Sequence, residues 1–331
     1  MPALVPLSPL DPLFILLAGL ALDAAAGDMR LLFRFVPHPV AALGALIGYL
    51  ERRLNRENRT AEARRLRGVV VVIAVVALAA LCGWLVLSVT RSWRWGWLIE
   101  IFLVGVLVAQ RSLYQHVIAV YRALESGGVS AGRDAVRHIV GRDPNSLDEH
   151  GVARAAVESL FENFADGVVA PSFWYLLFGL PGLMAYKAVN TLDSMIGHRS
   201  PRYLDFGAAA ARLDTAANFV PARLAGLIVA LAALVVPKGS PSSAFRTMLR
   251  DAKKHRSVNA GWPEGAAAGA LDLALAGPRR YGAEVVNDPW IGVGRARAVP
   301  DDIRRALYLF VAACLVHAAL IALLAVLRYQ A

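Results

Sequence analysis

The stretch Gly68–Val89, GVVVVIAVVALAALCGWLVLSV, decides the fold because it contains no charged residue. About 20 consecutive apolar residues of helix are enough to cross the hydrocarbon core of a bilayer. A second run, Ala306–Leu327, meets the same rule and is interrupted only by His317. In addition, 57% of the residues are hydrophobic and the mean hydropathy is +0.50, which is too apolar for an ordinary soluble protein. The sequence therefore predicts an all-α integral membrane protein, a polytopic helical bundle.

Four other apolar segments do not satisfy the length rule without further argument. Leu13–Ala26 and Trp97–Ala109 are shorter and each contains one acidic residue, which tilt or a partly buried position could accommodate. Val168–Tyr186 is interrupted by prolines and glycines, and Leu224–Val236 is short. Both could be re-entrant or interfacial, an arrangement that needs protein or water to cover the backbone. The predicted bundle therefore includes cytoplasmic and re-entrant helical segments.

The positions of the basic residues predict the topology, because cytoplasmic loops are enriched in Lys and Arg. No Lys or Arg precedes Arg30, so the first apolar segment should enter with its N-terminus outside. Residues 28–67 contain nine Arg and should be cytoplasmic, whereas Arg91 and Arg94 lie among three Trp in a predicted short external turn. We expect a multi-pass protein of the inner (plasma) membrane.

The region 111–305 holds 23 basic residues, and charge alone leaves two topologies open. Either Val168–Tyr186 and Leu224–Val236 both span the membrane, or neither does. The second is preferred, since a site built from Glu158, Lys187 and Arg223 needs them on one side. This reading divides the chain into N-terminal membrane helices with a basic loop (1–110), a catalytic, cytoplasm-facing region (111–305) and a C-terminal transmembrane helix (306–331).

Charged and amide side chains recur at helical spacing in the second third of this apolar chain. Glu158, Glu162 and Asp166 follow one another at intervals of four, which on an α-helix puts them on one face, with Arg154 one turn earlier. A solvated stripe is the alternative that would suit a soluble helix. In apolar surroundings, however, a charge is costly unless it is used. The spacing in these surroundings therefore favours a functional site over a solvated stripe.

Several common functional motifs are missing from the sequence. Gly-Lys never occurs, so there is no Walker A loop, and neither G-x-S-x-G nor H-E-x-x-H is present. The net charge of +10 suits anionic lipid and anionic substrates. It is not accompanied by a zinc-finger or other nucleic-acid-binding motif, and we expect no nucleic-acid partner. The remaining acids, amides and bases are of the kind that hold magnesium and phosphate.

Several short motifs follow one another along the chain. The most specific is the string Asn190-Thr191-Leu192-Asp193-Ser194-Met195-Ile196-Gly197. The others are His38-Pro39-Val40, Val140-Gly141-Arg142-Asp143, Arg154 to Ser159 with Glu162-Asn163, Asp166 to Pro171, Tyr186-Lys187-Ala188, Arg212-Leu213-Asp214, Pro221-Ala222-Arg223 and Asn259 to Glu264. In this order they resemble the CobD/CbiB family, whose members are adenosylcobinamide-phosphate synthases of cobalamin biosynthesis.

The resemblance implies an ATP-dependent reaction that joins adenosylcobyric acid to an aminopropanol phosphate (or aminopropanol) through an amide bond. ATP and Mg²⁺ are the cofactors it implies, and the bilayer, the corrinoid and the amine are the partners. A homo-oligomer, or an assembly with other cobalamin enzymes, is compatible with it. The catalytic residues implied are Lys187, Asp193, Glu158, Arg223 and His38. Implied metal ligands are Glu158, Glu162, Asp166, Asp193 and Asp214, and implied cofactor or substrate contacts are Arg142, Asp143, Arg154, Asn163, Asn190, Asn259, Trp262 and Glu264.

Simpler structural roles compete with some of these assignments. Lys187 directly follows an apolar run and could be a snorkelling interfacial anchor, and Arg223 could cap the interface in the same way. His38 lies between two prolines and could order a turn. Trp262 could stack on a planar ligand or sit at the membrane interface. Because Thr215 stands where a second Asp is common in the family, Asp214 would act alone or with Asn218 one turn later.

Two other classes of function remain open from the sequence. In a transporter, broken helices at Val168–Tyr186 and Leu224–Val236 would line a substrate pathway. That class predicts inverted repeats and more spans than the charge pattern supports. In a non-enzymatic membrane regulator, of the kind represented by the AmpE proteins, the polar residues between Glu158 and Asp193 would not be needed together.

Overall fold

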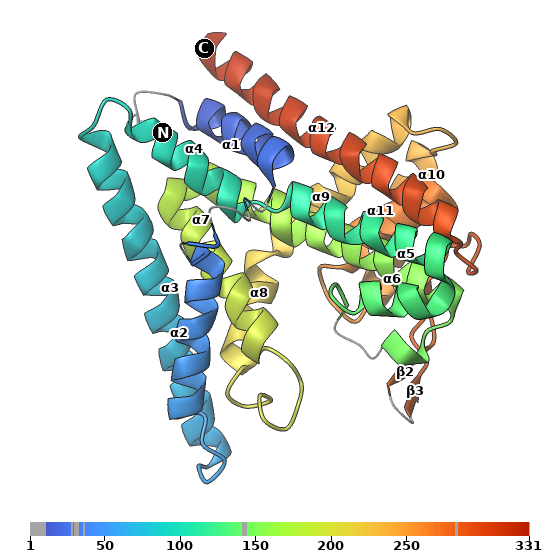
Figure 1. Ribbon diagram of the computed structural model, residues 1–331, viewed down its shortest axis with the longest axis horizontal. Coiled ribbons are helices and arrows are strands. Elements are labelled where there is room, and N and C mark those ends of the chain that lie inside the picture. Colours follow the sequence, from blue (N-terminus) through green and yellow to red (C-terminus); the bar gives the residue numbers. More distant parts are fainter. Residues whose placement is uncertain are drawn as a thin grey trace. The chain divides into compact units, whose positions relative to one another are not determined.

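The computed structural model describes residues 11–27, 29, 33–35, 37–140, 144–281 and 284–330, with side chains omitted for 279–281 and 284–286. The described chain is helical apart from two small two-stranded sheets, so the all-α prediction is confirmed (Figure 1). The helices are α1 (Pro12–Ala26), α2 (Pro39–Leu54), α3 (Ala61–Arg91), α4 (Gly96–Leu107), α5 (Gln110–Val136), α6 (Glu149–Phe164), α7 (Ala170–Ile196), α8 (Ala208–Ala217), α9 (Phe219–Ala232), α10 (Pro241–Asp251), α11 (Gly261–Leu271) and α12 (Pro300–Gln330).

Short helical turns and strands complete the chain. They are η1 (Pro144–Ser146), the π-helical turn η2 (Ala165–Val169), η3 (Ala233–Val235), η4 (Ala252–Lys254), β1 (Leu275–Ala276), β2 (Arg279–Tyr281), β3 (Glu284–Val286) and β4 (Trp290–Ile291). β1 pairs antiparallel with β4, with Leu275 opposite Ile291. β2 pairs antiparallel with β3, with Arg279 opposite Val286.

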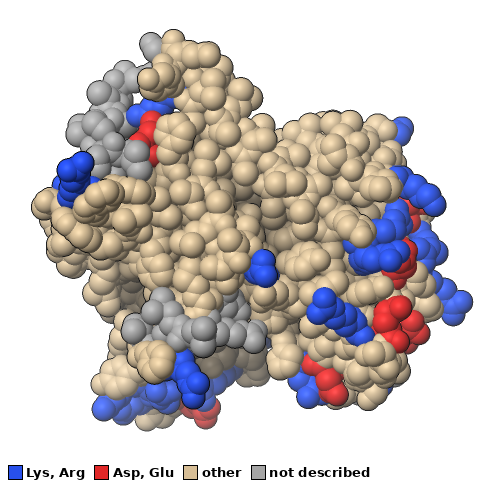
Figure 2. All heavy atoms as spheres, turned by 45° about the horizontal axis from the view of Figure 1, so that its top comes forward, with Lys and Arg blue, Asp and Glu red and all other residues tan. Residues whose placement is uncertain are grey.

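Four helical segments among the described residues are long and apolar enough to cross a membrane: Ala61–Arg91, Gly96–Val136, Glu149–Ile196 and Pro300–Gln330. A fifth candidate is the pair Ala208–Ala217 and Phe219–Val235, which is bent by 46°. The two apolar runs that carried the membrane prediction lie inside the first and last of the four. Large areas of the surface in Figure 2 are free of charge, with Lys and Arg gathered in patches, as expected for a protein seated in lipid.

The segment Val168–Tyr186 is helical but broken in the middle. Gly179 has φ 66° and ψ −154°, which interrupts α7, and Pro181 follows two residues later. Only a residue without a side chain adopts such a conformation at little cost. The proline and glycine residues of this segment therefore produce a kink rather than an end to the helix. Because the helix continues through the kink, this segment lies within the candidate span Glu149–Ile196. Whether it crosses the membrane stays a prediction.

Contacts divide the chain into two compact units that do not follow the order of the sequence. Unit 1 consists of residues 1–109, 170–218 and 324–331, and unit 2 consists of residues 110–169 and 219–323. The predicted first boundary, after residue 110, falls next to the first change of unit. The predicted continuous region 111–305 instead contributes to both units, because residues 170–218 pack with the N-terminal helices.

The core of unit 1 forms where α7 packs against α3 and α2. Buried Val71 and Val75 from α3 meet Ala188, Leu192 and Ile196 from α7. Gly83 lets α3 approach the α7 backbone closely, since a β-carbon there would lie 2.7 Å from Cα of Pro181. The other side of α3 exposes large apolar side chains, including Ile73, Leu81 and Trp84. Such a face suits lipid contact, where exposure of apolar side chains costs nothing.

In unit 2, α11 packs against α10, α9 and α6, and α5 packs against α6. The chain between α11 and α12 is held by a buried acid, Asp251, whose side chain is 1% exposed. Its carboxylate accepts hydrogen bonds from Arg250 at 2.8 and 2.6 Å and from the backbone N–H of Gly292 at 2.9 Å. The ammonium of Lys254 lies 2.7 Å away. Asp251 therefore fixes the start of the turn after β4.

We expect Asp251→Asn to lower the melting temperature of the protein at pH 7, because it removes the charge that these donors share. The hydrogen bonds from Arg250 hold the pKa of Asp251 well below its ordinary value, with further lowering by Lys254 and Gly292. The stabilisation is therefore fully present above an aspartate pKa of about 4 and is lost only as the pH falls through the lowered pKa. Thermal unfolding in detergent from pH 8 to pH 3 measures the effect.

The matched control is Asp134→Asn, since the side chain of Asp134 is 71% exposed and pairs only at the surface with Arg137. This control should melt close to the wild type across the range. Equal melting temperatures for Asp251→Asn and the wild type at pH 7 would show that the Asp251 carboxylate does not stabilise unit 2.

Candidate functional site

In unit 1, the last turns of α7 place three of the implied site residues on a partly exposed face. Lys187, Asn190 and Asp193 follow one another at intervals of three, and each side chain is half-buried. The opposite face is buried in the core of unit 1, so the helix cannot rotate without exposing that core. The end of α7 therefore has one packed face and one face that carries the Lys187 ammonium, the Asn190 amide and the Asp193 carboxylate.

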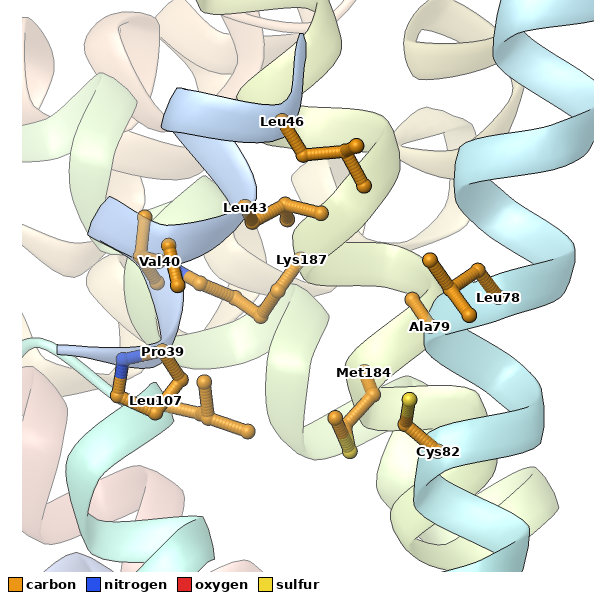
Figure 3. Close-up of a pocket in the computed structure, with 11 residues that line it drawn as sticks. Pro39, Val40, Leu43, Leu46, Leu78, Ala79, Cys82, Leu107, Met184 and Lys187 are labelled. Atoms are coloured by element: carbon orange, nitrogen blue, oxygen red, sulfur yellow. The ribbon is translucent and has the colours of Figure 1, made fainter. Parts of the chain in front are cut away.

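A cavity of about 250 Å³ adjoins this face. As far as the described part of the chain goes, its lining is apolar except for Lys187, and it comes from four helices. Figure 3 shows the Lys187 side chain extending from α7 toward Val40 in the first turn of α2. The lining residues are Pro39, Val40, Ala42, Leu43 and Leu46 of α2, Leu78, Ala79 and Cys82 of α3, Leu107 of α4, and Met184 and Lys187 of α7.

The position of this cavity argues against the interfacial-anchor interpretation of Lys187. Leu78, Ala79 and Cys82 stand in the middle of the uncharged run Gly68–Val89, not at its charged ends. A snorkelling lysine instead places its ammonium at the edge of such a run. An ionisable residue beside the middle of a spanning segment is costly and usually functional. The location of Lys187 therefore favours a role in binding or chemistry.

Asp214 joins a chain of buried polar groups in unit 1. The side-chain amide of Asn218 donates to Oδ1 of Asp214 at 3.1 Å. The hydroxyl of Tyr186 donates to the amide oxygen of Asn218 at 2.8 Å, and Asn218 is 1% exposed. Asn218 therefore contacts Asp214 from one turn later, and a joint role of the two residues stays a prediction. Tyr186 belongs to the Tyr186-Lys187-Ala188 motif, but its contact with Asn218 could not be expected from the sequence, because the two residues are 32 positions apart.

Two further unit 1 residues have identifiable local roles. His38 caps α2, since its Nδ1 accepts a hydrogen bond from the backbone N–H of Val40 at 3.2 Å. This is the structural role that competed with a catalytic one, and the catalytic role of His38 stays a prediction. Gly197 lies against Asp193, and any β-carbon at position 197 would collide with the Asp193 carboxylate. Gly197, at the end of the string Asn190–Gly197, therefore leaves the space that Asp193 occupies.

In unit 2, one face of α6 fastens the chain between α11 and α12. His150, Arg154 and Glu158 are spaced by four residues and each bonds to the backbone of that segment. The ring of His150 lies 2.8 Å from the carbonyl of Ala298, and Arg154 donates to the carbonyl of Ala296 at 2.7 Å. Glu158 accepts from the backbone N–H of Ala276 at 2.8 Å. The sequence indicated Arg154 and Glu158 as site residues. It could not indicate these partners, because backbone groups are the same in almost every residue type.

The three acids at intervals of four do not share one environment. Glu158 is buried, Glu162 is exposed and Asp166 is half-buried. Asp166 also lies in the π-helical turn η2, so it departs from the regular α-helical register that the spacing argument assumed. Asn163 is exposed, and its amide donates to the carbonyl of Ser159 at 2.8 Å. The end of α6 therefore presents Glu162 and Asn163, while Glu158 faces the interior of unit 2.

A second group in unit 2 lies around Arg223. Its guanidinium stacks on the ring of Trp262 at 4.5 Å and on that of Phe219 at 3.5 Å, measured to the ring centroids. Nearby in the sequence, Glu264 and Asn259 are 1% and 8% exposed, and His255 approaches Glu264 at 3.7 Å. Arg223 and Trp262, predicted separately, are thus brought together. The Arg154 guanidinium lies over Trp290 in the same way, at 5.3 Å.

The described residues include no group of three or more His, Cys, Asp or Glu side chains that could hold a metal ion. The implied metal ligands fall in both units, with Asp193 and Asp214 in unit 1 and Glu158, Glu162 and Asp166 in unit 2. Arg142 and Asp143, predicted to contact cofactor or substrate, lie outside the described residues. The implied set of metal-binding residues therefore stays a prediction.

We expect Glu158→Ala to destabilise unit 2 by about 1–3 kcal/mol, because it leaves the buried N–H of Ala276 without this acceptor. Glu158→Gln keeps an oxygen acceptor and should melt closer to the wild type. The matched control is Glu162→Ala, one turn later and exposed, which should have little effect on stability. Chemical unfolding of the purified protein measures all three. If Glu158→Ala is as stable as Glu162→Ala, Glu158 does not fasten β1.

Comparison with known proteins gives a consistent result over almost the whole chain. A family model described as CobD/Cbib protein matches residues 16–310. The protein named cobalamin biosynthesis protein CobD from Brucella anthropi is 51% identical over 301 residues, which cover 90% of this chain and 92% of the relative. Proteins of the same name from a Sinorhizobium species and from Rhodobacter capsulatus are 49% identical over 318 residues and 47% identical over 299 residues.

These two alignments cover 95% and 89% of this chain, and 98% and 92% of the relatives. No solved structure matches the chain. The family match extends from α1 into α12 and includes every motif on which the resemblance rested. The chain is therefore a member of the CobD/CbiB family, and its role lies in cobalamin biosynthesis.

Proposed function

We propose that the protein catalyses ATP-dependent amide formation between a propionate carboxylate of adenosylcobyric acid and the amine of (R)-1-amino-2-propanol O-phosphate. The observation that carries this proposal is the face of α7 that holds Lys187, Asn190 and Asp193 beside a cavity. An ammonium, an amide and a carboxylate within two turns of one rigid helix can meet phosphate oxygens and a phosphate-bound cation together. Asn190 and Asp193 belong to the family's most specific string, and Lys187 belongs to the neighbouring motif Tyr186-Lys187-Ala188, which supports the same role.

The reaction needs two steps whose atoms balance. A carboxylate oxygen of the corrinoid attacks the γ-phosphorus of ATP, which gives an acyl phosphate and ADP. The neutral amine then attacks the acyl carbon, the carbon–oxygen bond to phosphate breaks, and inorganic phosphate leaves as the nitrogen loses a proton. The protein's part is to place the reactants in line and to stabilise charge on the transferring phosphoryl group.

The donor chemistry of the chain fits a magnesium ion that arrives with ATP. Mg²⁺ is commonly held by one or two carboxylates together with substrate phosphates and water, so it does not need a cage of protein ligands. Asp193 of unit 1 and Glu162 of unit 2 are carboxylates with at least partial exposure, and either could supply such a ligand. When bound, the ion would neutralise phosphate charge. Asn190 would orient a phosphate or a water beside Asp193.

The unit 2 residues divide into positioning and contact roles under this proposal. Arg154 and Glu158 bond to backbone groups of unit 2, so we assign them positioning roles. Arg223 presents a guanidinium already held on aromatic faces, a state that reduces the entropy lost when it meets phosphate. Trp262 shares that stack, so its contact with a planar ligand would be at a ring edge or at the free face.

The direct test is incubation of the purified protein, in lipid nanodiscs, with ATP, Mg²⁺, adenosylcobyric acid and aminopropanol phosphate. Mass analysis of the corrinoid should show the amide product, with one ADP formed for each amide. Omission of ATP should abolish the product. A corrinoid of unchanged mass in the complete mixture, with folded protein, would contradict the proposal.

We expect Lys187→Arg to lower turnover by about tenfold or more, although the charge is kept. An ammonium acts as a compact point charge, whereas guanidinium is a planar fork with a different donor geometry. The control is Lys253→Arg, at an exposed lysine of unit 2, which should be neutral. Combining Lys187→Arg with Asp193→Asn should be little worse than either change alone, as for residues that serve one transition state. Near-normal turnover of Lys187→Arg would contradict a catalytic role and would show that Lys187 acts as an interfacial anchor.

A further inference from the structure

The cavity beside Lys187 has a lining that the chemistry of phosphate alone does not explain. Among the described residues, Lys187 is the one charged residue of the lining, and the others are aliphatic, Pro, Met or Cys side chains from α2, α3, α4 and α7. A site for a phosphate alone would surround it with further donors. This cavity instead joins one cation to an apolar volume, and such a combination selects a ligand with an anionic end and a hydrocarbon part.

The size of the cavity sets how much hydrocarbon it can take. Its volume is about 250 Å³, whereas a water molecule, similar in size to a methyl group, has a share of about 30 Å³ in the liquid. The cavity can therefore hold a group of several carbon atoms. An alkyl substituent of a ligand whose phosphate meets the Lys187 ammonium would lie against apolar lining residues such as Val40, Leu43 and Met184.

We propose that this cavity is the specificity pocket for the alkyl substituent of the amino-alcohol phosphate, with Lys187 holding the phosphate. The inference rests on the proposed function, and it assigns the amine substrate to unit 1. The pocket distinguishes substrates by the carbon group next to the phosphate ester. Ethanolamine phosphate has hydrogen at that position, aminopropanol phosphate has methyl, and 1-amino-2-butanol phosphate has ethyl.

The three amines give a graded test in the amide-forming assay. One added carbon in an apolar pocket changes kcat/KM by about 10- to 200-fold, so the methyl compound should exceed ethanolamine phosphate by about tenfold or more. Because the cavity is larger than a methyl group, the ethyl compound should react at least as well as the methyl one. Equal kcat/KM values for the hydrogen and methyl compounds, or strong rejection of the ethyl compound, would overturn the proposal.

Two neighbouring alanines of α2 provide a matched pair of variants. Ala42 lines the cavity and Ala41 does not, while both are exposed, so a larger side chain should be tolerated at either position. Ala42→Leu should fill the cavity and reduce the preference for methyl over hydrogen by about tenfold. Ala41→Leu should retain the wild-type preference.

Leu43→Ala provides the opposite change, since it enlarges the cavity and should move the preference toward the ethyl compound. A preference that is the same in the wild type, Ala42→Leu and Leu43→Ala would show that the substituent lies elsewhere.

A binding experiment separates failure of this inference from failure of the proposed reaction. If no amine yields amide, the proposed function is wrong, but methyl phosphate and n-propyl phosphate still probe the pocket by titration calorimetry in nanodiscs. Each buried methylene should tighten binding about fourfold, so n-propyl phosphate, with two more methylenes, should bind about 15-fold tighter than methyl phosphate in the wild type and Ala41→Leu. That difference should be lost in Ala42→Leu. Equal affinities for the two phosphates in the wild type would overturn the assignment of the cavity.

Discussion

The packing of α7 against α2 and α3 is the interaction on which the rest of unit 1 depends. Ala188, Leu192 and Ile196 bury one face of the helix in an apolar core, and this fixes the rotation of the helix about its axis. Lys187, Asn190 and Asp193 must then lie on the other face. Polar groups are costly in an apolar protein unless they have partners or a function. The same packing therefore provides both the stability of the unit and the placement of its charged groups.

In unit 2, a comparable arrangement uses hydrogen bonds in place of apolar packing. His150, Arg154 and Glu158 form a polar row on α6, and each bonds to a backbone group between residues 276 and 298. Buried backbone groups need such partners. The row fixes the backbone at Ala276, Ala296 and Ala298, so residues on α6 that look catalytic in the sequence are engaged in holding these points.

The sequence predicted the helical membrane fold well, because Gly68–Val89 and Ala306–Leu327 are governed by local composition alone. It also predicted that Asp214 and Asn218 could meet, since they are one helical turn apart. It could not predict that residues 170–218 pack with the N-terminal helices, because long-range packing leaves no periodic signal. Nor could it predict the π-helical turn at Asp166, which ends the regular spacing of the acids, or the cavity around Lys187, whose lining comes from four separate helices.

The central proposal is that Lys187 and Asp193 of unit 1 serve a reaction that uses cytosolic ATP. Single cysteines at Arg199 and Lys253, both exposed, test it most directly in a variant that lacks the two native cysteines. In intact cells, both positions should resist a membrane-impermeant thiol reagent and should react once the membrane is permeabilised. Labelling at position 199 alone in intact cells would place the end of α7 outside and would contradict the claim.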